Sequence, residues 1–240
     1  MLELKQVYKT FHAGTVNEKR AIDGLDLTLE DGDFVTVIGG NGAGKSTTLN
    51  LIAGVFPVDE GTIKLNGIDL TNLPEHKRAK FLGRVFQDPM RGTAATMGIE
   101  ENLALAYRRG KPRGLGHGIT NEERKLYREK LATLGLGLEN RMTSKVGLLS
   151  GGQRQALTLL MATLQKPDLL LLDEHTAALD PKTADKVLQL TEEIVARDHL
   201  TTLMVTHNMK HAIRYGNRLI MMDAGRVVVD IRGEEKKNLS

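Results

Sequence analysis

Cysteine is absent from the 240-residue chain, which excludes disulfide bonds and metal sites with thiolate ligands. Long apolar runs are missing too: residues 169–172 and 219–222 fall far short of the ~18–20 residues that cross a membrane as a helix. The N-terminus has no long apolar segment of the signal-peptide type. From these absences we expect a chain that works in the cytosol or on the cytosolic side of a membrane.

A strong charge of one sign is also lacking, since the formal net charge is only +3. So small an excess does not indicate a nucleic-acid partner, and we expect none. Positive residues do collect between Arg108 and Lys130, where they outnumber the glutamates. This stretch fits a solvated loop and helix face, or alternatively a lobe that lies near anionic lipid headgroups.

Short β-branched or leucine-rich segments alternate with helical patterns, which predicts an α/β fold with a largely parallel sheet. The predicted strands cover residues 33–39, 62–67, 83–88, 169–173 and 201–206. The predicted helices cover residues 45–54, 73–82, 121–134, 151–165 and 181–197. Residues 108–118 break both periodicities and predict a loop. Since residues 99–148 show helices without strands, we expect a helical lobe, bounded approximately by residues 96–160.

A glycine-rich stretch, GGNGAGKST, lies between a predicted strand and a predicted helix. Its Gly39-x-x-x-x-Gly44-Lys45-Ser46 spacing is that of the P-loop, in which successive backbone N–H groups point at a polyphosphate. Lys45 supplies a positive charge to the outer phosphates, and the Ser46 hydroxyl binds Mg²⁺. A simple glycine-rich turn would not explain the Lys-Ser pair. The predicted nucleoside triphosphate site comprises Gly39, Gly40, Asn41, Gly42, Ala43, Gly44, Lys45, Ser46 and Thr47.

Two acids follow the leucine-rich segment LLLLDE, at the point where a buried strand leaves the sheet. Carboxylates at such a position are costly unless they have a partner. Asp173 fits the Mg²⁺ shell, held directly or through water. Glu174 would face the γ-phosphate and polarise the attacking water. A plain turn is the alternative for this pair, and the upstream P-loop argues against it.

A second glycine-rich site begins the predicted helix at Ser150, Gly151, Gly152 and Gln153. The Ser150-x-x-Gln153 spacing matches the capping-box pattern, which would only start a helix. That reading does not explain two glycines in the first turn, because each costs ~1 kcal/mol relative to alanine. Bare backbone at a helix start lets a triphosphate approach closely. This half-pocket has no lysine or metal ligand of its own. We therefore expect the P-loop of a second copy to complete it in a two-fold dimer.

The motif LSGGQ, the P-loop and LLLLDE together resemble the ATP-binding cassette (ABC) family, and the likeness covers essentially the whole chain. The resemblance implies a P-loop NTPase core with a mainly parallel sheet, an N-terminal antiparallel β subdomain and an inserted helical lobe. All of these would lie in one nucleotide-binding domain of residues 1–240. The resemblance also implies ATP and Mg²⁺, and a signature loop at Ser150 to Gln153 that closes over the ATP of the partner subunit.

The same resemblance implies roles for further residues. Phe11 is similar to the aromatic residue that stacks on adenine, although Tyr8 competes for that role. Gln87 resembles the glutamine that contacts Mg²⁺ and water and senses the transmembrane partner. Asp180 resembles an aspartate that crosses the dimer interface, and it is also a good N-cap residue. His207 resembles the switch histidine at the γ-phosphate, expected to be catalytic with Glu174, whereas a lone histidine is more often structural.

The chain also departs from the family pattern. His175 stands where the family usually has proline, and Ala177 where it often has serine. Ala156 and Met161 replace arginines that are common after the signature, and Gly40 is unusual in its P-loop position. None of these changes removes a nucleotide or metal ligand, so ATP hydrolysis is still expected. The departures leave open the subfamily and hence the cargo.

These observations predict the ATP-hydrolysing subunit of a membrane transporter, peripheral on the cytoplasmic face of a bacterial cell membrane. Separate transmembrane permease subunits are expected to dock over residues 89–107, and the partner ATPase is expected to be a second copy. The likeness to binding-protein-dependent importers implies an extracytoplasmic substrate-binding protein and an amino acid, including aromatic ones, as cargo. The alternatives are an exporter ATPase, a soluble cassette that acts on nucleic acid or ribosomes, and an ATP-gated module without hydrolysis.

Overall fold

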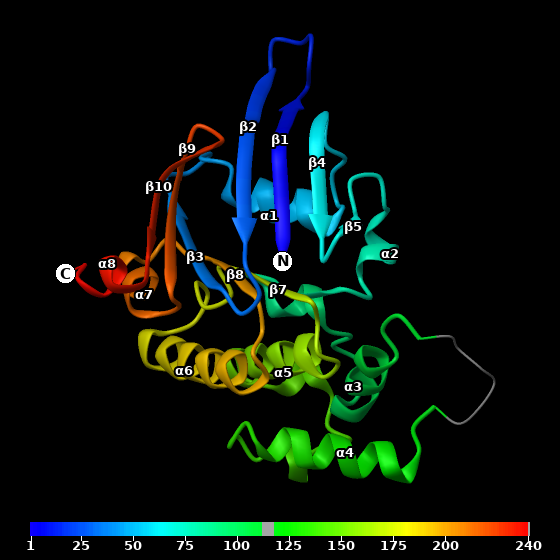
Figure 1. The fold of residues 1–240 in the computed structure, drawn as a ribbon. Coiled ribbons are helices and arrows are strands. Elements are labelled where there is room, and N and C mark those ends of the chain that lie inside the picture. Colours follow the sequence, from blue (N-terminus) through cyan, green and yellow to red (C-terminus); the bar gives the residue numbers. More distant parts are fainter. Residues whose placement is uncertain (112–117, 240) are drawn as a thin grey trace.

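Two β-sheets organise the protein in this computed structural model, which describes residues 1–111 and 118–239 (Figure 1). The strands are β1 Leu2–Phe11, β2 Lys19–Leu29, β3 Phe34–Gly39, β4 Glu60–Leu65, β5 Ile68–Asp69, β6 Leu82–Val85, β7 Leu169–Asp173, β8 Thr202–Val205, β9 Arg218–Asp223 and β10 Arg226–Arg232. The N-terminal sheet has the order β2-β1-β4-β5 and is antiparallel. The second sheet has the order β10-β9-β3-β8-β7-β6 and is parallel except at β10. The predicted fold class is confirmed.

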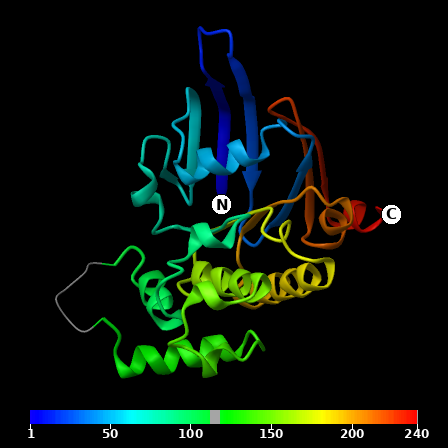
Figure 2. The same cartoon turned by 180° about the vertical axis from the view of Figure 1, so that it is seen from behind.

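The helices pack between and around these sheets. They are α1 Lys45–Ala53, α2 Glu75–Arg78, α3 Ile99–Tyr107, α4 Asn121–Ala132, α5 Gly151–Thr163, α6 Pro181–Asp198, α7 Met209–Arg214 and α8 Gly233–Lys237, with 3-10 helices η1 Pro89–Gly92, η2 Leu138–Asn140 and η3 Val146–Leu148. Helix α1 lies between the two sheets, and α5 and α6 lie on the other side of the second sheet (Figures 1 and 2). No helix in the described part of the chain is long and apolar enough to span a bilayer.

The four leucines of β7 explain why helices pack on both faces of the second sheet. Leu169 and Leu171 belong to the core that contains the apolar side of α1. Leu170 and Leu172 belong to the core that contains residues of α5 and α6. Successive side chains of a strand point to opposite faces, so a continuous apolar run covers both. All four side chains are fully buried.

The helices α3, α4 and α5 share a separate core below the sheet in Figure 1. Leu103 of α3, Tyr127 and Leu131 of α4, and Leu157 of α5 are fully buried in it. Ala156, one of the departures from the family pattern, is also buried there. The predicted loop at residues 108–118 lies in part outside the described residues, as does Arg113.

Two predicted elements are shorter in the structure. The helix expected over residues 73–82 is limited to α2, because Arg78 turns inward and its guanidinium donates to four backbone carbonyls. Two of those carbonyls belong to Leu51 and Ile52, so Arg78 caps the C-terminal end of α1. The strand expected over residues 83–88 ends at Val85. Further along the chain, Asp88 accepts a hydrogen bond from the Met90 N–H and is the N-cap of η1.

Candidate active site

The carboxyl ends of four neighbouring strands bring most of the predicted site residues into one row. The P-loop follows β3, His207 follows β8, Asp173 ends β7 and Gln87 follows β6. The parallel register aligns Val37 with Val205, and Val205 with Asp173. In open α/β sheets, ligands bind at this edge.

The P-loop turns sharply between β3 and α1, and two of its glycines are required by the geometry. Gly39 and Gly44 have φ angles of 151° and 100°, in the region that side-chain-bearing residues rarely adopt. A Cβ on Gly39 would lie 2.3 Å from the Met222 carbonyl oxygen, and one on Gly44 would lie 2.8 Å from the Ala21 carbonyl oxygen. Gly40, by contrast, has open space around it, so packing does not explain its glycine.

The first turn of α1 presents a cation and a hydroxyl. Lys45 Nζ donates to the carbonyl oxygens of Gly39 and Gly40, at 2.9 and 3.1 Å. An ammonium has three N–H donors, so one remains for a phosphate oxygen. Ser46 Oγ donates to Asp173 Oδ1 at 3.2 Å, which joins the P-loop to the end of β7.

Asp173 is approached on its other side by Arg84 of β6, a residue that the sequence analysis missed. The Arg84 guanidinium lies 3.9 Å from Asp173 Oδ2 and donates to the side chain of Asn50 on α1. Burial raises the pKa of Asp173 above its ordinary value, and the Ser46 hydroxyl and the Arg84 guanidinium oppose this rise. Burial likewise lowers the pKa of Arg84. The signal in the sequence was a charged residue inside the short strand LGRV.

The oxygens of Ser46 and Asp173 fit a Mg²⁺ ion. Octahedral Mg²⁺ holds oxygen ligands at about 2.0–2.1 Å, which places neighbouring ligands about 2.9 Å apart. The 3.2 Å between Ser46 Oγ and Asp173 Oδ1 is close to that spacing. Gln87 is exposed just past β6, and within residues 1–111 and 118–239 no hydrogen bond joins it to either of them.

Glu174 and His207 are in contact at the same edge. Glu174 has a φ of 45°, which is unusual for a residue with a side chain and is typical of strained functional positions. Its N–H donates to the Val205 carbonyl at 3.0 Å, and its Oε2 lies 3.3 Å from His207 Nδ1. A cleft of about 540 Å³ adjoins both residues and continues to Asp185 and His211.

His175, which follows Glu174 in the chain, is buried. Its side chain is 2% exposed, and its Nε2 lies 3.2 Å from Thr191 Oγ1 on α6. Because Thr191 donates its own hydroxyl to the Val187 carbonyl, Nε2 of His175 is the donor in this pair. Burial lowers the pKa of His175 to about 4, so the ring is neutral at pH 7.

The predicted second half-pocket begins α5, on the opposite side of the sheet from α1 (Figure 2). The capping box is present, with Gln153 N–H donating to Ser150 Oγ and Ser150 N–H donating to Gln153 Oε1. A Cβ on Gly152 would lie 2.3 Å from Thr183 Cγ2, in the first turn of α6. Gly152 therefore also accommodates a neighbouring helix of its own chain, which sequence reasoning missed.

The remaining predicted residues lie apart from this row. Phe11 ends β1 and packs edge-to-face on Phe56, with ring centroids 5.1 Å apart. The Tyr8 ring instead lies against Gly24 of β2. Asp180 is the N-cap of α6, and its Oδ1 accepts a hydrogen bond from the Thr183 N–H at 3.1 Å. The Thr183 side chain and then this N–H lower the pKa of Asp180. The N-cap reading of Asp180 is thus confirmed.

A P-loop between a central parallel strand and a helix, with two acids at the end of a nearby strand, defines a P-loop nucleoside triphosphatase. A family model described as "ABC transporter" matches residues 22–177. The chain is 46% identical over 240 residues to the "Tyrosine transport ATP-binding protein" of Clostridioides difficile (strain R20291), covering 100% of this chain and 95% of that protein.

The chain is also 36% identical over 231 residues to a "Methionine import ATP-binding protein" of Enterococcus faecalis (strain ATCC 700802 / V583). That match covers 95% of this chain and 64% of the relative. A solved ATP-binding cassette, a dimer in a post-hydrolysis state bound to ADP and Pi, matches with a TM-score of 0.82 and 32% identity, over 97% of this chain and 98% of that one. The chain belongs to the ABC transporter family, as an ATP-binding and ATP-hydrolysing subunit of the kind that dimerises and works with transmembrane permeases.

Proposed function

We propose that this chain drives the import of an amino acid, with tyrosine as the first candidate, from the cytoplasmic face of a bacterial membrane. The observation that carries the cargo is the 46% identity, over the whole chain, to a tyrosine transport ATP-binding protein. The extracytoplasmic substrate-binding protein and the permease subunits would recognise the amino acid. This chain would supply the energy by closing and opening around ATP.

In this proposal the nucleotide lies along the P-loop, with its base on Phe11. Phe11 is favoured over Tyr8, because the Tyr8 ring packs against Gly24 within the sheet. The third N–H of Lys45 would bind the outer phosphates, and the backbone N–H groups of residues 40–47 would surround them. Mg²⁺, held by Ser46, Asp173 and Gln87 with water, would neutralise charge on the phosphates.

Glu174 is proposed as the residue that orients and deprotonates the attacking water. Its carboxylate stands at the end of β7, one residue beyond the proposed metal ligand Asp173. His207, whose Nδ1 lies 3.3 Å from Glu174 Oε2, would hold the carboxylate in place and contact the γ-phosphate through its other ring nitrogen. The positive φ of Glu174 supports this role, because strain of that kind persists where a geometry is functionally fixed.

The signature residues Ser150, Gly151, Gly152 and Gln153 are proposed to contact the nucleotide of a second copy, and Asp180 to cross the interface. Support comes from their position on α5, across the sheet from the P-loop helix (Figure 2). A relative of 32% identity is a dimer with ADP and Pi. A two-fold homodimer would complete two equivalent sites.

The permease is proposed to dock over residues 89–107. Met90 and Leu105 in this segment are 42% and 45% exposed and offer apolar surface to a partner. A cleft of about 670 Å³ opens along α3, lined by Glu101, Ala104, Leu105 and Arg108. A short amphipathic helix would bury the apolar residues and pair with the flanking charges.

Homodimer closure is tested with the Glu174→Gln variant, which should bind ATP but not hydrolyse it. With Mg²⁺ and ATP, light scattering should show a doubling of the molar mass. Adding Ser150→Arg should abolish the doubling without weakening nucleotide binding by the single chain. A Glu174→Gln protein that stays monomeric when saturated with ATP contradicts the shared site.

The cargo is tested in proteoliposomes that contain this chain with its transmembrane subunits and binding protein. Labelled tyrosine should accumulate on the side of the membrane where this chain lies, and only when ATP is supplied on that side. Lys45→Ala should abolish the accumulation. Unlabelled phenylalanine and methionine serve as competitors that define the selectivity. ATP-dependent movement of tyrosine toward the binding-protein side would instead identify an exporter.

A further inference from the structure

A second lysine stands at the P-loop, on a different strand from Lys45. Lys19 begins β2 and is the Cα partner of Phe11 across the β1–β2 pair. A Cβ built on Gly42 of the P-loop would lie 3.1 Å from Lys19 Nζ and 4.0 Å from its Cε. The side chain therefore reaches from the strand position beside Phe11 to the middle of the phosphate loop.

The charge of Lys19 is not neutralised by the protein in the described part of the chain. Lys9 of the same sheet lies 2.6 Å from Asp59, and Arg20 lies 3.0 Å from Asp23. For Lys19, residues 1–111 and 118–239 provide no ion pair and no hydrogen bond. An exposed ammonium beside a loop of N–H donors adds positive charge to a site that already holds Lys45. Such a cluster of positive charge favours an anion.

We propose that Lys19 is a further cationic contact for the nucleotide, which binds the phosphate chain at the end nearest the base. Lys45 is held at the inner end of the loop by the carbonyls of Gly39 and Gly40. Lys19 approaches from the Phe11 side, over Gly42, so the α- and β-phosphates of ADP or ATP lie within its reach. This inference rests on the proposed function, which puts the base on Phe11 and the phosphates in the P-loop.

The test is Lys19→Met, with adenosine and ADP titrated into the nucleotide-free chain by calorimetry. Loss of one partly exposed, charge-assisted contact should raise the dissociation constant for ADP about 5–10-fold. Lys19→Arg should retain most of the ADP affinity, because the charge remains. Adenosine binding should not change, since adenosine carries no phosphate.

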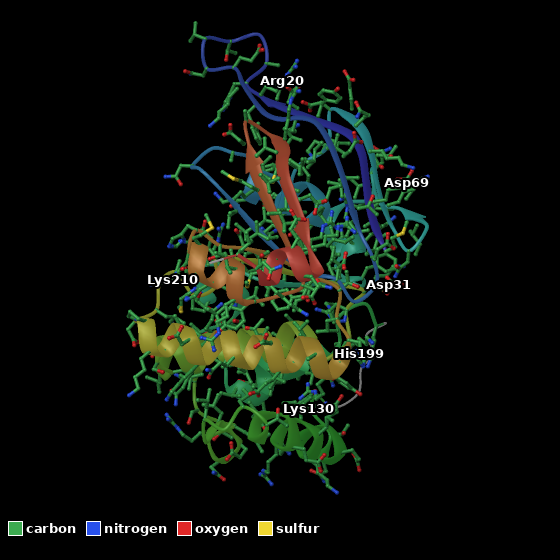
Figure 3. All side chains as sticks on the ribbon, turned by 60° about the vertical axis from the view of Figure 1, so that its left-hand side comes forward. Arg20, Asp31, Asp69, Lys130, His199 and Lys210 are labelled. Atoms are coloured by element: carbon green, nitrogen blue, oxygen red, sulfur yellow. The ribbon has the colours of Figure 1, made fainter. Side chains whose placement is uncertain are left out.

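The matched control is Arg20→Met, which removes the same charge one residue further along β2. Neighbouring strand residues point to opposite faces. Arg20, which Figure 3 labels near the top of the N-terminal sheet, is paired with Asp23. Arg20→Met should therefore leave ADP affinity within about twofold of the parent protein, as expected for a screened distant charge. The slope of affinity against salt concentration should fall for Lys19→Met and not for Arg20→Met.

A third variant separates failure of this inference from failure of the proposed function. Lys45→Ala should abolish ADP binding, and ADP binding at parental strength would overturn the P-loop placement itself. If Lys45→Ala loses ADP while Lys19→Met and Arg20→Met behave alike, only the role of Lys19 is overturned. An equal loss of adenosine and ADP affinity in Lys19→Met also overturns it, because the contact would then not be to phosphate.

Discussion

Replacing Gly152 by alanine tests the contact between α5 and α6 directly. The added Cβ would lie 2.3 Å from Thr183 Cγ2, whereas carbon atoms in contact are normally about 3.5–4.0 Å apart. Thr183 cannot readily turn away, because it is β-branched and its N–H is bonded to Asp180 in the first turn of α6. Overpacking of this kind costs about 1–3 kcal/mol. Alanine gains about 1 kcal/mol over glycine in a helix, so we expect a net loss of about 0–2 kcal/mol of unfolding free energy.

The expected remedy is Thr183→Ser, which removes Cγ2 and keeps the hydroxyl. Urea unfolding of the nucleotide-free chain should show the double variant Gly152→Ala/Thr183→Ser to be more stable than the sum of the two single changes predicts. The coupling energy should reach about 1 kcal/mol, as for residues in direct contact. Gly151→Ala is the matched control, because its Cβ would lie 3.2 Å from the end of the flexible Leu179 side chain. It should cost little.

Additive single changes would refute the packing argument, because residues in direct contact show a coupling energy. The measurement is made without nucleotide, so a contact between Gly152 and the nucleotide of a partner contributes nothing to it. A separate ATPase assay of the double variant then distinguishes the two roles of this glycine. Activity that stays low after stability is restored would assign the remaining loss to the dimer interface.

Two further predictions concern charge. Arg84→Met removes the guanidinium that lies beside Asp173 and helps to orient its carboxylate, so the Mg²⁺ concentration for half-maximal ATPase activity should rise about 10-fold, and less in Arg84→Lys. Unchanged Mg²⁺ dependence would contradict this orienting role. Burial lowers the pKa of His175 to about 4, below the ordinary value of about 6.5. Between those values the unfolded chain binds the extra proton and the native state does not, so the free energy of unfolding falls by about 1.4 kcal/mol for each pH unit of acidification. When denaturant unfolding is measured at about pH 7 and at about pH 4.5, the free energy of unfolding should therefore fall by about 2 kcal/mol more for the parent than for His175→Gln. An equal fall in the two proteins would contradict a buried neutral ring.

The sequence predicted those parts of the site that depend on local backbone chemistry. The P-loop glycines and Lys45 act within one turn of chain, so their spacing alone defined the loop that the structure shows. The capping box at Ser150 and the N-cap at Asp180 are local in the same sense. The row formed by Asp173, His207 and the P-loop needed one more step, because it follows from strands that run parallel in a single sheet.

The contacts that sequence reasoning missed join segments far apart in the chain. Arg84 meets Asp173 only because β6 and β7 are neighbours, and nothing in the strand LGRV names that partner. Arg78 was placed in a longer helix because its helical neighbours satisfy the pattern. Its guanidinium instead caps α1, more than twenty residues earlier. In the sequence, Gly152 was explained by the close approach of a nucleotide. Its contact with Thr183 was missed because that contact depends on how α5 crosses α6.

The alternation within β7 also bears on why a shared site is favoured over one completed within a single chain. Leu169 and Leu171 pack toward α1, while Leu170 and Leu172 pack toward α5 and α6. For Ser150 to reach the P-loop of its own chain, α5 would have to leave this second core and expose side chains such as Leu159, which is fully buried. Each buried leucine costs about 1.5–3 kcal/mol to expose, a large part of the 5–15 kcal/mol that stabilises a typical domain. A second copy brings its own Ser150 to the P-loop with both cores intact.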